Sequence, residues 1–258
     1  MIDLRPEDII HKSYINRLLM EIVDQPLMAQ FLAFKGGTCA SMLGYLDRFS
    51  VDLDFDVLRG ADEAKLRNEF QQVFDQLGFG VTLKFDKVLF FQLRYPSSPG
   101  KRSTLKVSAS NIRIKANQYK VQYFPEIDRL INSQTIETMV ANKLVAVTDR
   151  YAQHKTIAGR DIYDIHHFLI QGYSYNGAVI QERTGFDPKK YFGKLIDFIK
   201  EHVTQTIINE DLNSLLPNKQ FQQVRKILIP ETLSMLTPLQ KRPDISSPNC
   251  TLLKRRVS

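Results

Sequence analysis

The chain has 258 residues, 43% of them hydrophobic, which is enough apolar material for one large domain or two smaller ones and excludes a wholly disordered chain. Lys and Arg number 35 against 28 Asp and Glu, and this basic excess suits an anionic partner without fixing the fold. The two cysteines, Cys39 and Cys250, lie far apart in the sequence, which excludes a disulfide framework and a CxxC metal cluster.

Membrane insertion is not expected. No apolar stretch approaches the ~20 residues of a membrane helix. The N-terminal segment MIDLRPEDII is acidic and polar, whereas a signal peptide begins with a basic segment followed by an apolar one. We therefore expect a soluble, cytoplasmic protein.

The first half of the chain has the pattern of a mixed α/β domain. Apolar residues recur at intervals of three and four over 8–23, which predicts an amphipathic helix. An apolar run at 31–34, the segment KGGT and a helical stretch at 40–46 predict a strand, a turn and a helix. The alternation over 50–57 predicts a strand with a carboxylate face. The remaining elements expected here are a helix at 61–77 and strands at 79–85, 88–95, 104–114 and 119–124.

After residue 125 the pattern becomes helical. The helices expected from apolar periodicity cover 135–151, 160–171, 176–183, 188–203 and 221–227. Residues 241–258 combine Pro, Ser and basic side chains with little to bury, which predicts a flexible tail. The sequence thus predicts an α+β fold with a mixed-sheet domain at 1–128, an α-helical domain at 129–240 and the tail at 241–258.

Gly36, Gly37 and Thr38 stand between the expected strand and helix. Such a turn exposes backbone N–H groups at the start of a helix, where an anion such as a phosphate binds. An ordinary turn with a capping threonine has the same sequence. These residues alone leave both interpretations open.

Asp52 and Asp54 are two residues apart on the expected strand, so both side chains project from one face. They can reach one hard divalent cation such as Mg²⁺, which takes one or two carboxylates together with substrate phosphates. The alternative is a solvated strand face, although three carboxylates in register with no basic residue among them repel one another. The pattern favours a metal site at Asp52 and Asp54 and leaves the role of Asp56 open.

The turn and the acidic strand belong to one motif. KGGT at 35–38 is followed by a helix and then by RFSVDLDFD at 48–56. This order resembles the first motif of the nucleotidyltransferase superfamily and, more narrowly, the AbiEii/AbiGii family of bacterial nucleotidyltransferase toxins, found in toxin–antitoxin and phage-abortive systems. The family's downstream signature is matched by KLVA at 143–146 and RDIYD at 160–164. The resemblance covers about residues 34–169.

The resemblance implies a nucleotidyltransferase-like mixed sheet, a helical domain packed on it, and an NTP bound in the cleft between them. It assigns Mg²⁺ or Mn²⁺ to Asp52 and Asp54 and implies a role for Asp161, either in polar contacts that complete the site or in deprotonating the acceptor hydroxyl. Without the resemblance, Asp161 and Asp164 fit a solvent-facing acidic helix start. The nucleotide-binding residues implied are Lys35, Gly36, Gly37, Thr38, Ser50 and Lys143.

One position departs from the superfamily pattern. Polymerase-type members have a third carboxylate on a later strand that faces D-x-D, whereas the expected counterpart here, LKVSAS at 105–110, contains hydroxyls and no acid. Two carboxylates still hold Mg²⁺ together with a triphosphate, but the pattern argues against a two-metal site with three acidic ligands. Glu126 and Asp128 are later acids whose spacing does not argue for them.

The function implied is metal-dependent transfer of an NMP from an NTP to the 3′ end of a tRNA, with a cognate antitoxin as partner. Transfer to a protein side chain, and binding of nucleotide or RNA without turnover, remain as alternatives. A basic stretch with interspersed aromatic residues fits either a nucleic-acid backbone or a solvated face. Its basic residues are Arg94, Lys101, Arg102, Lys106, Arg113, Lys115 and Lys120.

Overall fold

The computed structural model describes residues 6–98 and 101–241, and within them seven strands form one sheet. The strands are β1 Leu32–Lys35, β2 Asp52–Val57, β3 Gly80–Lys84, β4 Leu89–Arg94, β5 Thr104–Ser110, β6 Tyr119–Phe124 and β7 Arg129–Gln134. Their order across the sheet is β3-β4-β5-β2-β1-β7-β6. The pairs β2–β5 and β1–β7 are parallel and the other neighbours are antiparallel, so the sheet is mixed.

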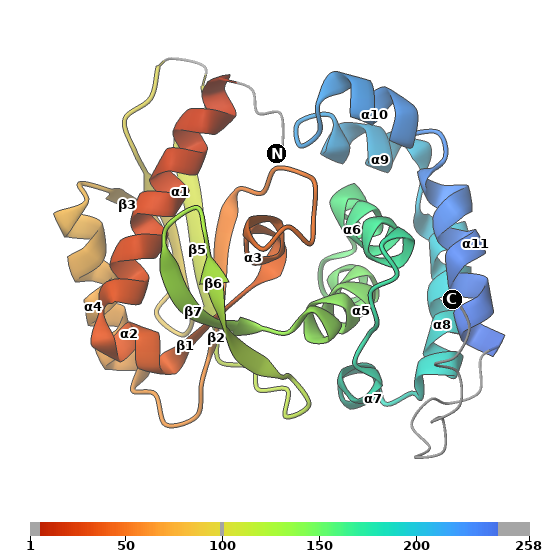
Figure 1. Ribbon diagram of the computed structural model, residues 1–258, viewed down its shortest axis with the longest axis horizontal. Coiled ribbons are helices and arrows are strands. Elements are labelled where there is room, and N and C mark those ends of the chain that lie inside the picture. Colours follow the sequence, from red (N-terminus) through yellow and green to blue (C-terminus); the bar gives the residue numbers. More distant parts are fainter. Residues whose placement is uncertain (1–5, 99–100, 242–258) are drawn as a thin grey trace, which may run out of the picture.

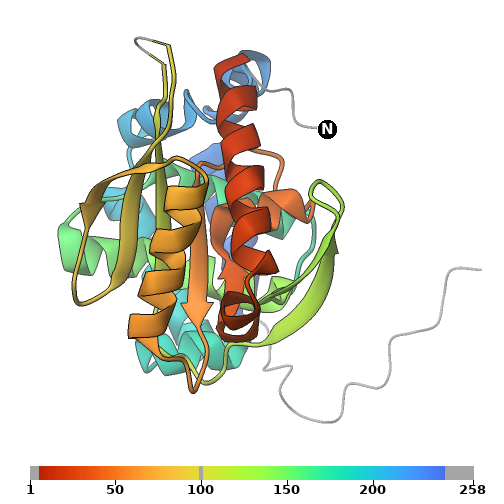
Figure 2. The same cartoon turned by 90° about the vertical axis from the view of Figure 1, so that its left-hand side faces the viewer.

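Helices lie on both sides of this sheet. Those of the first half are α1 Pro6–Asp24, α2 Pro26–Phe31, α3 Gly36–Met42 and α4 Glu63–Gln76. Those of the second half are α5 Ile136–His154, α6 Gly159–Ile170, α7 Gly177–Thr184, α8 Pro188–His202, α9 Gln205–Leu212, α10 Asn218–Val224 and α11 Leu228–Lys241. Figures 1 and 2 show α1 and α4 against one face of the sheet, and α3 on the other side, toward the second-half helices.

The predicted α+β fold is confirmed. Its predicted helices and strands are present with shifted ends, and four further elements were not predicted: α2, β7, α9 and α11. Because β7 continues the sheet to Gln134, the change to helices lies after the predicted division at 128. Whether the two halves are separate domains stays a prediction, and the predicted flexible tail lies outside the described residues except for its first residue, Lys241.

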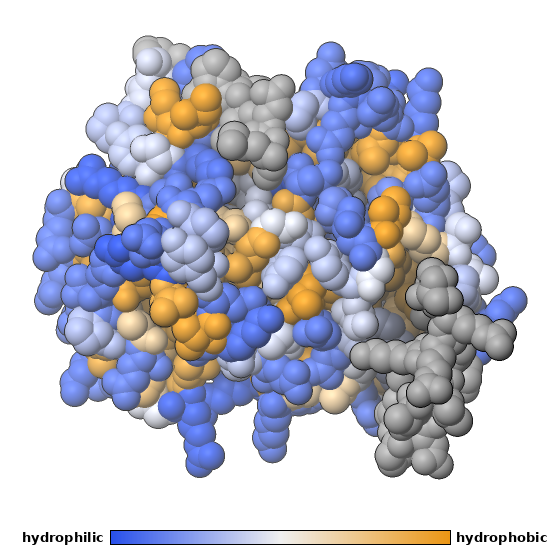
Figure 3. All heavy atoms as spheres, viewed as in Figure 1, coloured by the Kyte–Doolittle hydropathy of each residue, from blue (hydrophilic) through white to orange (hydrophobic). Residues whose placement is uncertain are grey.

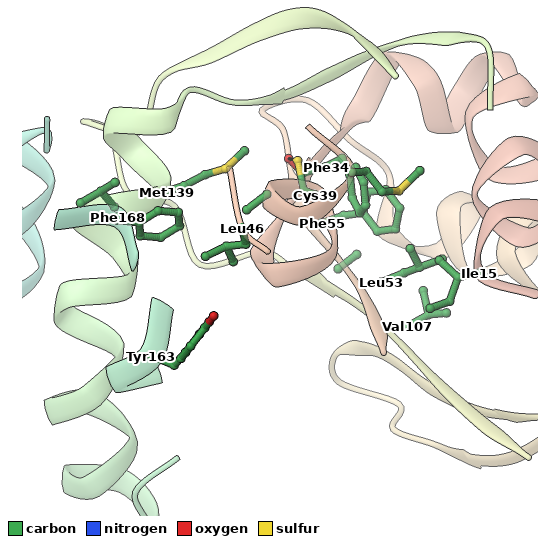
Figure 4. Close-up of a cluster of buried hydrophobic side chains, with 14 of the residues drawn as sticks. Ile15, Phe34, Cys39, Leu46, Leu53, Phe55, Val107, Met139, Tyr163 and Phe168 are labelled. Carbon is green, nitrogen blue, oxygen red and sulfur yellow. Dashed lines mark hydrogen bonds between the residues drawn. The ribbon is translucent and has the colours of Figure 1, made fainter. Parts of the chain in front are cut away.

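The core is continuous from the sheet into the helical half. Phe34 of β1 packs against Phe55 of β2, with ring centroids 5.3 Å apart. Figure 4 shows Leu46 beyond α3, with Met139 and Phe168 of the helical half on its far side. These side chains are buried in one hydrophobic cluster, so apolar packing joins the two halves.

The surface carries scattered apolar groups. Figure 3 shows small groups of hydrophobic side chains separated by hydrophilic ones on the face that it views. Among the most exposed are Val121 (64%) and Leu130 (70%), on the paired strands β6 and β7. Along the described ranges, no helix combines the length and apolar character needed to cross a bilayer.

A buried histidine connects α1 to the sheet. His11 Nε2 lies 2.9 Å from the carbonyl oxygen of Val51, and Nδ1 lies 2.6 Å from the hydroxyl of Tyr95. The neutral ring satisfies both contacts when Nε2–H donates to Val51 and Nδ1 accepts from Tyr95. Burial lowers the pKa of His11 to about 4, so the His11 ring is neutral in the folded protein at neutral pH.

We predict that acidification destabilises the protein through His11. The unfolded chain takes up a proton near pH 6.5, whereas His11 in the folded protein does so near pH 4. Its contribution is therefore complete above pH 6.5 and is lost as the pH falls toward 4, by up to about 3 kcal/mol. An NMR titration should place the pKa of His11 near 4, and a value of 6 or above would contradict the prediction. The loss of unfolding free energy over this range should be shallower in His11→Asn.

Candidate functional site

The predicted turn at 35–38 is wrong, because α3 begins directly after β1, at Gly36. The first residues of α3, 36–38, touch the acidic strand, and we call them the glycine turn. Gly36 has a φ of +79°, and a Cβ atom at this position would lie 2.7 Å from Asp54 Oδ2. A Cβ atom on Gly37 would lie 2.9 Å from both Arg48 Nη2 and Ser50 Oγ. A side chain at Gly36 would strain the backbone and meet Asp54, and one at Gly37 would have to displace Arg48 or Ser50, so both positions favour glycine. The peptide backbone therefore approaches the Asp54 carboxylate closely.

Thr38 and Ser50 join this turn to the start of β2. Thr38 Oγ1 lies 2.9 Å from Ser50 Oγ and 2.5 Å from the carbonyl oxygen of Asp52. Thr38 is buried, and Ser50 is half-buried. Both hydroxyls thus lie directly behind the glycine turn and fix its position relative to the acidic strand.

Asp52 and Asp54 form a half-buried carboxylate pair on β2. Ser108 of β5 lies opposite Asp54, and its hydroxyl donates to Asp54 Oδ1 at 2.6 Å. Burial, together with the nearby charge of Asp54, raises the pKa of Asp52. Two carboxylates that repel each other in a partly desolvated place make a bound cation favourable, and two oxygen-bearing side chains suit Mg²⁺ or Mn²⁺.

Asp56 has a different environment from the other two aspartates. Its carboxylate accepts hydrogen bonds from Lys35 Nζ at 2.5 Å, from the Tyr119 hydroxyl at 3.0 Å and from Gln134 Nε2 at 2.6 Å. Burial and the neighbouring Asp56 charge raise the pKa of Tyr119, which therefore stays a donor. Asp56 is consequently occupied by protein donors, one of them the cation Lys35, and is not a third carboxylate for a metal.

Other acids do not complete a three-carboxylate site. Ser108 occupies the position beside Asp54 on β5, Glu126 pairs with Lys12 at 2.7 Å, and Asp128 accepts from Tyr123 at 2.9 Å. Over residues 6–98 and 101–241, no group of three or more His, Cys, Asp or Glu side chains is placed to hold a metal ion. The donor set available to a cation is therefore the Asp52–Asp54 pair.

A buried ion cluster lies across the pocket from the turn. Lys143 Nζ of α5 is 2.9 Å from Asp161 Oδ1 and 2.9 Å from Asp164 Oδ2, both on α6. Arg48 binds Asp164 through two nitrogens, at 2.5 and 2.7 Å. Arg150 Nε lies 3.2 Å from the second oxygen of Asp161. Since Arg48 belongs to the segment before β2, the cluster ties the acidic strand to the helical half.

The electrostatics of this cluster keep Lys143 charged. Burial opposes the charged forms, but Asp161 and Asp164 together raise the pKa of Lys143. Burial likewise opposes ionisation of Asp161, yet Lys143 and Arg150 lower its pKa to about 2. Three cations, including Arg48, thus surround two carboxylates and leave a positive surplus. A carboxylate this acidic is a weak proton acceptor, which favours polar contacts over base catalysis for Asp161.

A pocket of about 380 Å³ lies between the turn and these helices. Lys35, Gly36, Gly37, Lys143 and Arg150 line its charged part. Arg183 and the Asp56 carboxylate also line the pocket, and the rest of its wall is apolar or carries amides and hydroxyls, from residues that include Ile112, Ile114, Met139, Phe168, Asn117, Asn142 and Ser110. A ligand that combines an anionic group with a flat heterocycle matches this mixture of basic and apolar lining.

The structure brings the expected residues to one region but gives them different positions. Lys35, Gly36, Gly37 and Lys143 line the pocket itself. The remaining five are not on its wall: Thr38, Ser50, Asp52 and Asp54 lie beside or behind the turn, and Asp161 holds Lys143.

The site also contains a pair for which sequence reasoning proposed no role. Arg48 and Asp164 are 116 positions apart, and no periodicity relates them. Their presence within the two matched motifs was the available indication. Asn142, which accepts a hydrogen bond from Arg183 at 2.7 Å in the pocket wall, had no such indication.

We predict that removing Arg48 strongly destabilises the fold. Arg48→Met leaves Asp164 with Lys143 as its remaining cation, and breaking a buried ion pair on one side typically lowers the unfolding free energy by about 3–5 kcal/mol. The matched control is Arg129→Met, because Arg129 makes a similar two-nitrogen contact with Asp24 on the surface. That variant should lose less than about 1 kcal/mol. Urea unfolding curves measure both, and equal losses would contradict the prediction.

Comparisons with known proteins agree with this geometry. A family model described as nucleotidyl transferase AbiEii toxin, type IV toxin–antitoxin system, matches residues 17–238. JHP933 from Helicobacter pylori has a similar crystal structure, with 21% identity, a TM-score of 0.57, and coverage of 93% of this chain and 94% of that chain. MenT4, a nucleotidyltransferase toxin from Mycobacterium tuberculosis, is 19% identical, with a TM-score of 0.53 and coverage of 92% and 88%. At these identities the two structures support the fold alone. No curated protein matches the sequence significantly.

Proposed function

This chain belongs to the AbiEii family of nucleotidyltransferase toxins, and from that premise we propose that it transfers an NMP from an NTP to the 3′ end of a tRNA. The observation that carries the proposal is the pocket in which the glycine turn faces Lys143, beside the Asp52–Asp54 pair. The toxin would act in the bacterial cytoplasm, where NTPs and tRNA are present, as part of a toxin–antitoxin or phage-defence system with a cognate antitoxin.

The nucleotide would lie with its phosphates toward the turn and its base toward the apolar wall. Lys143 supplies a charged ammonium, held in place by Asp161 and Asp164. Gly36 and Gly37 supply backbone without side chains, which lets phosphate oxygens approach closely. The positive surplus of the ion cluster favours the tetra-anionic triphosphate over a neutral ligand.

Asp52 and Asp54 would hold a divalent cation, Mg²⁺ or Mn²⁺. Their placement on one face of β2 fits this assignment, as do the burial and the nearby Asp54 charge, which together raise the pKa of Asp52. The cation would supply neutralisation of charge on the transferred phosphate. Asp56 would take no part in metal binding, because Lys35, Tyr119 and Gln134 occupy its carboxylate.

In the proposed reaction an acceptor hydroxyl attacks the α-phosphorus. A new bond from the acceptor oxygen to the α-phosphorus forms while the bond from that phosphorus to the oxygen bridging to the β-phosphate breaks. Pyrophosphate leaves, and the hydroxyl proton passes to solvent water. Lys143 stabilises the charge that grows on the leaving group, and the rigid turn keeps the triphosphate aligned. Catalysis then depends on positioning and electrostatics, since the reaction needs no covalent enzyme intermediate.

We predict that Asp54→Ala abolishes transfer and that Lys143→Ala slows it by ~10²–10³-fold, the usual loss when one group that stabilises transition-state charge is removed. Purified protein is incubated with Mg²⁺, total bacterial RNA and each labelled NTP separately, and the products are resolved on a gel. Asp75→Asn is the matched control, because Asp75 is exposed on α4. It should retain wild-type activity.

The products distinguish the possible acceptors. Label in a tRNA-sized band with the wild type and the control, but not with Asp54→Ala, supports the proposal and identifies the base. Label on a protein would show that the acceptor is a protein side chain instead of RNA, with the same active site. Nucleotide binding without any labelled product would contradict turnover, and full activity of Asp54→Ala or Lys143→Ala would contradict the assignment of that residue.

A further inference from the structure

We propose that the acceptor RNA binds as a single strand across the open face of β3, β4 and β5, which we call the β3–β5 face. This inference rests on the proposed function and specifies where its acceptor lies. The β3–β5 face consists of Phe85 at the end of β3, Phe90, Gln92 and Arg94 of β4, and Thr104, Lys106 and Ser108 of β5.

Strand register makes this face continuous with the carboxylate pair. Lys106 of β5 lies opposite Asp52 of β2 on one side and opposite Gln92 of β4 on the other. Side chains of directly opposed residues project from the same face of a sheet. The hydrogen bond between Ser108 and Asp54, at 2.6 Å, follows the same rule one step along the strands. An RNA strand bound to Lys106 therefore reaches Asp52 on the same face of the sheet.

The face is open to solvent, whereas the opposite face is covered. Phe91 of β4 points the other way and packs against Phe70 and Phe74 of α4, with ring centroids 5.3 and 5.1 Å apart. Arg94 and Lys106 are exposed. Figures 1 and 2 show α1 and α4 on the covered side.

The charge on this face suits a phosphate backbone. Lys106 lies opposite Asp52, and its charge acts on the Asp52 carboxylate together with the charges of Arg102 and of Arg160 on α6. Neither Lys106 nor Arg94 forms a salt bridge within the part of the chain that the structure describes, and both side chains are exposed. Their charges can therefore contact phosphates of a ligand on this face.

Two aromatic rings, Phe85 after β3 and Phe90 of β4, lie at the end of the face away from Arg94 and favour an RNA single strand. Phe90 is half-exposed and Phe85 is 49% exposed, with ring centroids 5.4 Å apart. Gln92, between the rings and Arg94, carries an amide that donates to Thr82 at 3.3 Å. Stacking surfaces beside a basic track are the combination that binds unpaired bases and their backbone.

The position of this face also suits the direction of attack. The pocket reaches the other end of the same two strands, at Asp56 and Ser110, while Asp52 and Lys106 lie at the opposite end. An acceptor that reaches the carboxylate pair from the Arg94 and Lys106 end of the face would approach the α-phosphate from the side away from the nucleotide pocket. In-line displacement requires the acceptor and the leaving group on opposite sides.

The test compares two double variants that each remove one Arg and one Lys charge. Arg94→Gln/Lys106→Gln changes the β3–β5 face, and Arg59→Gln/Lys65→Gln changes exposed residues at and just before α4, on the covered side. Binding of a fluorescent single-stranded RNA is measured by anisotropy over a series of salt concentrations. We expect the first variant to bind about tenfold more weakly at low salt, with a slope of log K against log salt smaller by about 1.4, corresponding to two phosphate contacts. The second should bind like the wild type.

Binding of Mg²⁺ with a non-hydrolysable NTP should not weaken in either variant, because losing the Lys106 charge beside Asp52 does not oppose cation binding there. Weaker RNA binding with no loss of Mg²⁺–NTP binding separates the β3–β5 face from the nucleotide pocket. Equal weakening in both variants, wild-type RNA binding by the first, or no RNA binding by the wild-type protein would each overturn the proposal. If the first variant alone loses RNA binding but the wild type transfers no nucleotide to RNA, RNA binding by the β3–β5 face is supported. Nucleotide transfer to RNA is then contradicted.

Discussion

Two buried carboxylates of α6, Asp161 and Asp164, hold the site together. Asp164 lies between Arg48, which precedes the acidic strand, and Lys143 of α5, and Asp161 holds Lys143 from the second side. Burying these charges is unfavourable unless all of them are paired, so the sheet half and the helical half must meet in one arrangement. That requirement fixes the distance between the glycine turn and Lys143, and hence the width of the pocket.

The three aspartates of the acidic strand lie in different surroundings. Asp56 lies deepest, where Lys35 neutralises it and two further donors complete its hydrogen bonds. Asp54 lies against Gly36, and Asp52 lies nearest the basic residues around the strand's start. Along one strand the environment thus changes from a structural ion pair to a carboxylate pair suited to a cation, and then to a basic surface suited to an acceptor.

Local patterns in the sequence were enough to predict the acidic strand and most helices, whereas the segment predicted as a separate turn is the start of α3. The alternation over β2 and the spacing of apolar residues are set by elements within a few residues of one another. Four elements were not predicted, three of them for physical reasons. α2 has six residues, β7 is a short polar strand stabilised by its neighbours, and α11 contains Pro238, which local rules place outside helices. Only α9 had a usable local indication, the capping hydroxyl of Thr204.

Residues of the candidate site could be predicted only where they lie together in one of the matched sequence motifs. Lys143 and the turn were predicted through the resemblance, whereas the solvent-facing interpretation of Asp161 and Asp164, drawn from helix position alone, is wrong because both are buried. Their partner Arg48 lies 116 positions away from Asp164. Pairings over such distances depend on how the two halves pack, which no local pattern encodes.

The most direct test of this arrangement is a crystal structure with Mn²⁺ and a non-hydrolysable NTP. We predict an anomalous Mn²⁺ peak within about 2.3 Å of Asp52 and Asp54 oxygens. The triphosphate should lie between Gly36 and Lys143, with the base against the apolar wall that includes Phe168. Nucleotide bound elsewhere, or a metal bound without either aspartate, would contradict the central claim that the turn, the carboxylate pair and Lys143 form one active site.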